Sequence, residues 1–159
     1  MTTFASVVSN DYSPCTYGRD SPYDYGIDCT DVSGSEMLNA FRRNKDNTNI
    51  NGLHFSKIND DNIDDILAEI IEIVASTAGD RVHKLAFFRI PKLTKVPRAV
   101  RKLRYLNFVS FDQNEALKIL TSGSLSFSAR MAPNVYFTYN PDLYQIERGT
   151  FQGINHHLI

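Results

Sequence analysis

The chain has 159 residues, a formal net charge of −1 and 42% hydrophobic residues, as expected for one ordinary globular domain. The nearly neutral charge gives no general reason to expect nucleic acid or a membrane surface as the partner. No run of about 18 apolar residues is present, so the sequence predicts no membrane span, and the opening MTTFASVVSN lacks the basic region and apolar core of a signal peptide.

Residues 1–14 are predicted to be a flexible segment, and residues 15–50 an N-terminal cap that contains Cys15, Cys29 and a weak first repeat unit at Ile27. The two cysteines are 14 residues apart, which excludes a Cys-x-x-Cys metal or redox motif. Two interpretations remain: a disulfide that closes the loop, worth roughly 3 kcal/mol, or two unrelated reduced thiols. The loop is poor in aliphatic residues, so burial cannot order it, and the disulfide is favoured.

Four later segments share the pattern L-x-F followed by further apolar residues. The pattern occurs at Leu53-His-Phe55, Leu85-Ala-Phe87, Leu106-Asn-Phe108 and Val135-Tyr-Phe137, so its phenylalanines are separated by 32, 21 and 29 residues. Alternating apolar residues lie on one face of a short strand. The steps of 21 and 29 residues match the period of roughly 20–29 residues of a leucine-rich repeat, and the first unit, at 32, is overlong. Two units also share a Gly-Ser/Thr-apolar ending, at Gly123 and Gly149. Four units in phase argue against the alternative of a chance match.

The repeats predict an α/β fold over residues 51–153: a leucine-rich-repeat solenoid with a short parallel sheet on its concave face and helices or turns on its convex face. An N-terminal disulfide cap precedes it, and residues 154–159 form a tail. The clearest helix has apolar residues at helical spacing from Ile63 to Val74, with Asp60 or Asp61 as its cap and Gly79 at its end. The acids at its start do not have the spacing of a calcium-binding loop.

In such a fold the outward residues of the strands form the concave surface, where aromatic side chains are favoured anchors for a protein or peptide partner. The predicted partner-binding residues are His54 and Ser56 from the first unit, Phe88 from the second, Tyr105 and Asn107 from the third, where Val109 is also predicted to point outward, and Asn134, Tyr136 and Thr138 from the fourth. The alternative is that Phe88 or Tyr105 only covers an adjacent repeat or loop.

Residues 89–104 form a basic segment without an acidic residue. Its seven cations are Arg89, Lys92, Lys95, Arg98, Arg101, Lys102 and Arg104. One interpretation is a patch that binds an acidic glycan or lipid. The other is a solvated convex surface, which is favoured because Pro91 and Pro97 make one continuous basic helix unfavourable.

Motifs for nucleophilic catalysis, phosphate binding and zinc binding are absent from the sequence, so the chain is predicted not to be an enzyme and to need no cofactor or metal. His156 and His157 have no neighbouring Asp, Glu or Cys and are expected to lie in the tail rather than in a metal site. Nucleic acid is not an expected partner, because no module of interleaved aromatic and basic residues is present.

Several segments resemble secreted arthropod leucine-rich-repeat proteins similar to the non-catalytic subunit of Oplophorus-luciferin 2-monooxygenase. They are S-P-C-T-Y-G, I-D-C-T-D-V, E-M-L-N-A-F, L-T-K-V-P-R-A-V and L-Y-Q-I-E-R-G-T-F-Q-G. The resemblance implies a secreted, disulfide-stapled solenoid without an active site, which binds a protein or peptide or serves as an accessory subunit beside a catalytic chain. The sequence departs from the family in lacking a signal peptide and a cysteine-rich C-terminal cap.

Overall fold

A computed structural model describes residues 10–18, 26–126 and 133–151. Most of the predicted flexible N-terminal segment, the predicted tail and the pair His156 and His157 lie outside these ranges. The described elements are β1 (Thr16–Gly18), β2 (Gly26–Thr30), α1 (Gly34–Arg43), β3 (Gly52–Ser56), α2 (Ile63–Ala78), β4 (Lys84–Phe88), the 3-10 helix η1 (Arg98–Lys102), β5 (Phe108–Asp112), β6 (Ile119–Leu120), β7 (Asn134–Thr138) and β8 (Gln145–Ile146).

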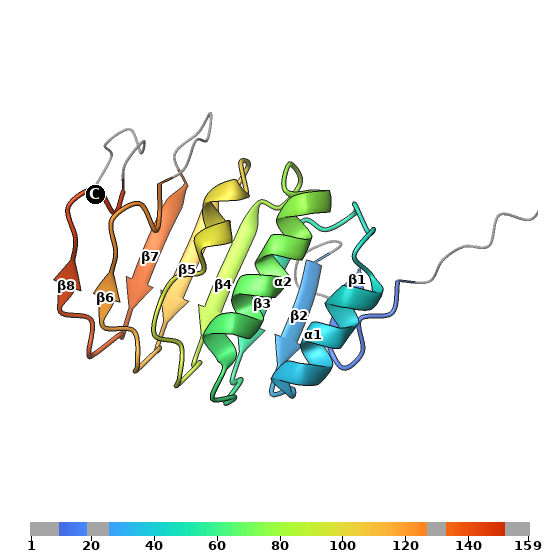
Figure 1. Ribbon diagram of the computed structural model, residues 1–159, viewed down its shortest axis with the longest axis horizontal. Helices are drawn as coiled ribbons and strands as arrows, with labels where there is room; N and C mark the ends of the chain where they lie inside the picture. Colours follow the sequence, from blue (N-terminus) through green and yellow to red (C-terminus); the bar gives the residue numbers. More distant parts are fainter. Residues whose placement is uncertain (1–9, 19–25, 127–132, 152–159) are drawn as a thin grey trace, which may run out of the picture.

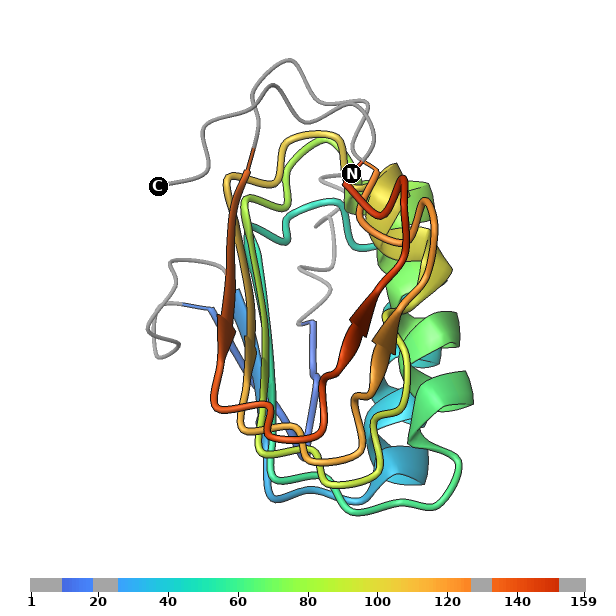
Figure 2. The same cartoon turned by 90° about the vertical axis from the view of Figure 1, so that its left-hand side faces the viewer.

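The fold is mixed α/β and has two layers (Figure 1). One layer is a sheet in the order β1-β2-β3-β4-β5-β7, in which β1 is antiparallel to β2 and all later neighbours are parallel. The other layer holds the three helices and the parallel pair β6-β8, as an end-on view shows (Figure 2). The predicted α/β class and the parallel sheet are therefore confirmed.

The five parallel strands pair in one register, so the same position of each strand enters the core. The inward residues are Ile27 and Cys29, Leu53 and Phe55, Leu85 and Phe87, Val109 and Phe111, and Val135 and Phe137. From β3 to β7 their phenylalanines form a stacked column, with ring centroids 5.7 Å apart for Phe55 and Phe87, 5.0 Å for Phe87 and Phe111, and 5.1 Å for Phe111 and Phe137. The first three of these rings are completely buried, so the column is a large part of the core.

The strand predicted for the third unit lies too early in the chain. The sequence pattern placed it at 106–108, whereas β5 is Phe108–Asp112, and Val109, predicted to point outward, is completely buried beside Leu85. Leu106-Asn-Phe108 and Val109-Ser-Phe111 both satisfy L-x-F. The strand forms around Val109-Ser-Phe111, because this register brings Phe111 into the column next to Phe87. With this correction the anchors Cys29, Phe55, Phe87, Phe111 and Phe137 are 26, 32, 24 and 26 residues apart.

The predicted helix is confirmed as α2, but its predicted capping is not. Asn62 precedes the helix and no side chain caps it. Instead, the Asp60 carboxylate accepts a hydrogen bond of 2.9 Å from the Gly34 N–H at the start of α1. Gly79 does end the helix, with a right-handed backbone, and an added Cβ would lie only 2.5 Å from the Ala75 carbonyl oxygen. The glycine is thus required by close packing rather than by a left-handed turn.

Every parallel strand ends in the same turn. The residue after each strand has a positive φ between 50° and 56°, and these residues are Asp31, Lys57, Arg89, Gln113 and Tyr139. The first four donate their backbone N–H to the last carbonyl of the next strand at 2.9–3.0 Å. Non-glycine residues rarely adopt this conformation, so its repetition shows that the stacked units share one turn geometry.

In the last two of these turns, the asparagine that follows the positive-φ residue forms side-chain hydrogen bonds to the preceding unit. The side chain of Asn114, which is completely buried, accepts a hydrogen bond from the Ile90 N–H at 3.0 Å and donates one to the Phe87 carbonyl at 3.1 Å. Asn140 repeats the arrangement one unit later, accepting from the Asn114 N–H at 3.0 Å and donating to the Phe111 carbonyl at 2.8 Å. The side chains therefore satisfy backbone groups that the strands leave unpaired.

The N-terminal end of the core is closed by a Cys15–Cys29 disulfide, so the alternative of two reduced thiols is wrong. Cys29 occupies the position that Phe55 holds in the next strand. Phe41 from α1 and Tyr12 continue the aromatic packing there, with ring centroids 5.2 Å apart. Burial raises the pKa of the Tyr12 hydroxyl to about 12, although a hydrogen bond from Asn47 acts in the opposite direction.

We expect loss of this disulfide to lower the free energy of unfolding by about 3 kcal/mol, because it closes a loop of 14 residues that has little apolar surface of its own. Urea unfolding of the native chain with and without reductant measures the effect. The double variant Cys15→Ala, Cys29→Ala is the control, because reductant should not change its midpoint. Equal midpoints for the native chain in both conditions would contradict the prediction.

Candidate functional site

The candidate site is the side of the large sheet that points away from the helices, which we call the strand face. It carries Asp28 and Thr30 from β2, His54 and Ser56 from β3, Lys84, Ala86 and Phe88 from β4, Phe108, Ser110 and Asp112 from β5, and Asn134, Tyr136 and Thr138 from β7. These residues alternate with the buried ones along each strand. No described helix or strand covers them (Figure 2).

Six of the eight predicted binding residues belong to the outward rows of the strands: His54, Ser56, Phe88, Asn134, Tyr136 and Thr138. Ser56 is only 2% exposed, however, so its neighbours cover it. Tyr105 and Asn107 do not belong to these rows, because both precede β5. The register of β5 instead places Phe108, Ser110 and Asp112 there, and these are the residues that the sequence pattern missed. The adjacent pattern Val109-Ser-Phe111, with the same spacing, was the feature of the sequence that could have located them.

Aromatic side chains occupy two places on the strand face. The rings of Phe108 and Tyr136 lie 5.2 Å apart, and Tyr136 remains 47% exposed. Phe88 lies toward the other end of the strands, under the Arg89 guanidinium, whose central carbon is 4.9 Å from the ring centroid. Between these two places the cross-strand neighbours Ala86 and Ser110 have small side chains. The strand face thus carries two aromatic contact sites, separated by a strip of small side chains.

The polar groups of the strand face lie beside these rings. One oxygen of the Asp112 carboxylate, Oδ1, is buried without a hydrogen-bond partner, and its cross-strand neighbours are Phe88 and Thr138. A buried carboxylate oxygen without a donor is costly, but this oxygen has almost no accessible surface, so a ligand would reach it only after a side chain moves.

On the neighbouring strands β2 and β3, His54 Nδ1 is 3.3 Å from Asp28 Oδ2. The Thr30 hydroxyl donates to Asp28 Oδ1 at 2.6 Å. An Asp–His pair can orient an imidazole for catalysis when a nucleophile stands next to it. Here the next residue in the row is Ala86, and Ser110 lies one strand farther away. Two strand spacings are about 10 Å, so no direct hydrogen bond from His54 to Ser110 is expected.

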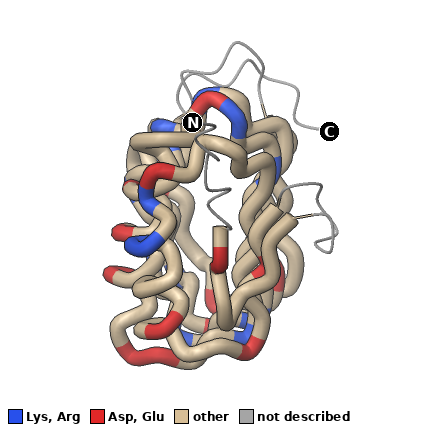
Figure 3. Tube along the Cα trace, turned by 90° about the vertical axis from the view of Figure 1, so that its right-hand side faces the viewer, with Lys and Arg blue, Asp and Glu red and all other residues tan. Residues whose placement is uncertain are grey.

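The basic segment 89–104 does not form one patch. Lys92 Nζ is 2.5 Å from the Asp61 carboxylate, Lys102 is paired with Glu72, and Arg89 donates to the Gln113 side chain at 2.7 Å. The four remaining cations of the segment, Lys95, Arg98, Arg101 and Arg104, are exposed and form no ion pair with a described acidic residue. Acidic and basic positions alternate on the helix side (Figure 3), which fits a solvated surface with ion pairs between units.

The ion pair of Lys92 lowers the pKa of Asp61, chiefly through the hydrogen bond and then through its charge. Among residues 10–18, 26–126 and 133–151, no group of three or more His, Cys, Asp or Glu side chains is arranged to hold a metal. In the same part of the chain, none of the helices has the length and apolarity needed to cross a membrane.

Comparisons of the chain with protein-family models, with curated proteins and with solved structures found no match. Arguments about its function therefore rest on the geometry and chemistry of the strand face.

Proposed function

We propose that the chain is a leucine-rich-repeat solenoid that acts as a non-catalytic binding module and recognises a protein or peptide through the strand face. The repeat assignment is supported by buried residues with the spacing L-x-x-L-x-L-x-x-N. They are Leu106, Val109, Phe111 and Asn114 in one unit, Val82, Leu85, Phe87 and Ile90 in another, and Ile50, Leu53, Phe55 and Ile58 in a third.

The observation that carries the binding proposal is the ring pair of Phe108 and Tyr136 on a face without a covering element. Aromatic anchors dominate the binding energy of many interfaces, and here two rings lie together on one face of the sheet. An extended peptide could contact both aromatic places across the small side chains of Ala86 and Ser110.

The disulfide supports a secreted or extracellular setting, because such bonds persist in oxidising compartments. In that setting the partner is a separate protein, and the resemblance to non-catalytic luciferase subunits suggests a catalytic chain as one such protein. A stable complex of that kind would survive purification under native conditions.

The proposal is tested by affinity capture with the native chain, followed by measurement of Kd for the captured partner. We expect Phe88→Ala and Phe108→Ala each to raise Kd by about tenfold or more, as loss of an interface anchor does. Tyr105→Ala is the matched control: Tyr105 is 46% exposed but lies outside the strand face. Equal affinity for all three variants would place binding elsewhere and overturn the proposal.

A further inference from the structure

The two edges of the large sheet differ in how their strands are held. At the N-terminal end the antiparallel strand β1 pairs with β2, and the Cys15–Cys29 disulfide fastens the two segments. At the other end β7 is the last strand, and within the described ranges no further strand pairs with it. Unpaired edges of this kind attract a strand from another chain unless something blocks them.

Strand β7 carries none of the usual blocking devices. Its sequence, Asn-Val-Tyr-Phe-Thr, contains no charged residue and no proline, and it pairs with β5 over its whole length without a bulge. Lysine or proline in the strand, or a bulge, would prevent pairing with another edge. Among the described residues the edge of β7 is thus unpaired, and the strand is rich in residues that favour β structure.

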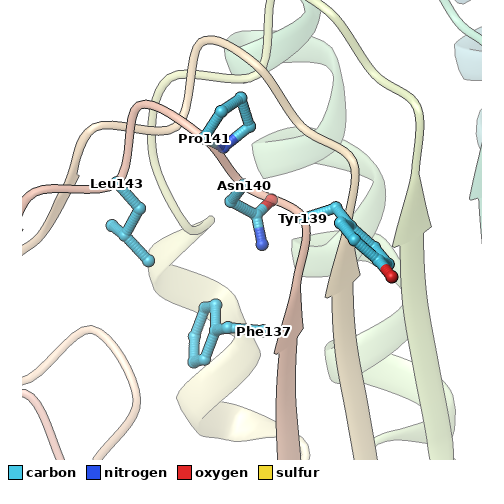
Figure 4. Close-up of a pocket in the computed structure, with 5 residues that line it drawn as sticks. All are labelled: Phe137, Tyr139, Asn140, Pro141 and Leu143. Atoms are coloured by element: carbon cyan, nitrogen blue, oxygen red, sulfur yellow. The ribbon is translucent and has the colours of Figure 1, made fainter.

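The core is incompletely covered at the same end. Phe111 is completely buried, whereas Phe137, the last ring of the column, is only half-buried. A hollow of about 500 Å³ lies beside it, lined by Phe137, Tyr139, Asn140, Pro141 and Leu143. Figure 4 shows the rings of Phe137 and Tyr139 on opposite sides of β7, with Leu143 on the side of Phe137. Tyr139 is 77% exposed, so apolar surface continues around the edge strand.

The hydrogen bonds of β7 show which backbone groups remain for a partner. The Asn134 N–H donates to the Asn107 carbonyl, and the Thr138 carbonyl accepts from the Gln113 N–H. These residues, and Tyr136 between them, therefore direct their backbone groups toward β5. Because alternate residues of a strand direct their groups to opposite sides, Val135 and Phe137 direct theirs to the open edge.

We propose that this edge is the docking site of a second copy of the chain, with the two β7 strands paired antiparallel about a two-fold axis at Tyr136. Head-to-tail stacking would pair β7 with β1, the edge strand at the other end of the sheet, which is only three residues long. Two β7 edges can pair over all five of their residues, which gives a closed symmetric dimer. The inference does not depend on what the strand face binds.

The sequence of β7 suits this pairing. With Tyr136 opposite Tyr136 of the second copy, Val135 lies opposite Phe137 and Asn134 opposite Thr138. The backbone groups of Val135 and Phe137 then form hydrogen bonds with those of the second copy, and the half-buried Phe137 is covered. No like charges are brought together, because the strand has none.

Charge substitution at Tyr136 tests the dimer. Sedimentation of the native chain should give a mass that rises with concentration toward twice the 18.0 kDa of one chain. Tyr136→Lys and Tyr136→Glu should each raise the dimer Kd by at least about tenfold, since like charges face each other across the axis. An equimolar mixture of the two variants should recover the native Kd or a lower one. Tyr105 is nearly as exposed as Tyr136 but lies away from the edge, so Tyr105→Lys should leave the dimer Kd unchanged.

Amide exchange by NMR supplies a second measurement. On raising the concentration, the amides of Val135 and Phe137 should become protected, while those of Tyr136 and Thr138 are protected throughout. A monomer at all concentrations, a growing series of oligomers, or a dimer that both Tyr136 variants retain would overturn the proposal. The proposal would also be overturned if Tyr105→Lys weakened the dimer as much as the Tyr136 variants do. Circular dichroism establishes that each variant is folded.

Discussion

Replacing Phe87 with alanine should lower the free energy of unfolding by about 3–5 kcal/mol. Phe87 lies in the middle of the stacked column, completely buried, with Phe55 on one side and Phe111 on the other. Removing its ring leaves a cavity that neither neighbour can fill, because each is held by its own strand in the sheet. Urea unfolding followed by circular dichroism measures the change.

The matched control is Phe137→Ala, which removes the same side chain at the end of the column. Phe137 stacks on one ring only, Phe111, and is half-buried, so we expect a loss of less than about half that of Phe87→Ala. Unfolding should be measured at a low protein concentration, where any self-association through β7 contributes little. Equal losses for the two variants would show that the column does not act as one packed core.

Replacing Asn114 with alanine should cost about 2–5 kcal/mol of unfolding free energy. The side chain is completely buried and satisfies two backbone groups of the preceding unit, the Ile90 N–H and the Phe87 carbonyl. Alanine leaves both without a partner away from water, and each such group costs about 1–3 kcal/mol. Thermal and urea unfolding of the native and variant chains provide the comparison.

Asn140→Ala and Asn107→Ala are the controls for Asn114. Asn140 makes the same two kinds of bond one unit later but is only half-buried, so its loss should cost less. Asn107 is exposed, and its replacement should change stability by no more than about 0.5 kcal/mol. A loss for Asn114→Ala no larger than that for Asn107→Ala would mean that the side-chain bonds contribute nothing.

The local pattern was sufficient for most of the elements. Alternation around Phe55, Phe87 and Phe137 predicted three strands, and helical spacing predicted α2 with its end at Gly79. The period of 3.6 residues for a helix and two for a strand is carried by the chain itself, so it can be recognised without knowing the partners. The low content of aliphatic residues between the two cysteines favoured the disulfide for a similarly local reason.

Partners across units could not be predicted in this way. Asp60 or Asp61 was expected to cap α2, yet Asp60 accepts a hydrogen bond from the Gly34 N–H. Within the first turn, Asp64 accepts one from the Thr94 N–H at 2.9 Å. The buried role of Asn114 and the pairing of Lys92 with Asp61 likewise join residues at least 24 positions apart. Such contacts depend on which units become neighbours, and spacing along the chain does not specify that.

The same limit applied to the candidate site. His54, Phe88 and Tyr136 follow from alternation in strands that the pattern located correctly, and they lie on the strand face. In the third unit two consecutive patterns of this kind, Leu106-Asn-Phe108 and Val109-Ser-Phe111, were equally good locally. A shift of strand register decides which side chains face outward. The choice of Phe108, Ser110 and Asp112 over Tyr105 and Asn107 was made by packing, because only Phe111 continues the column between Phe87 and Phe137.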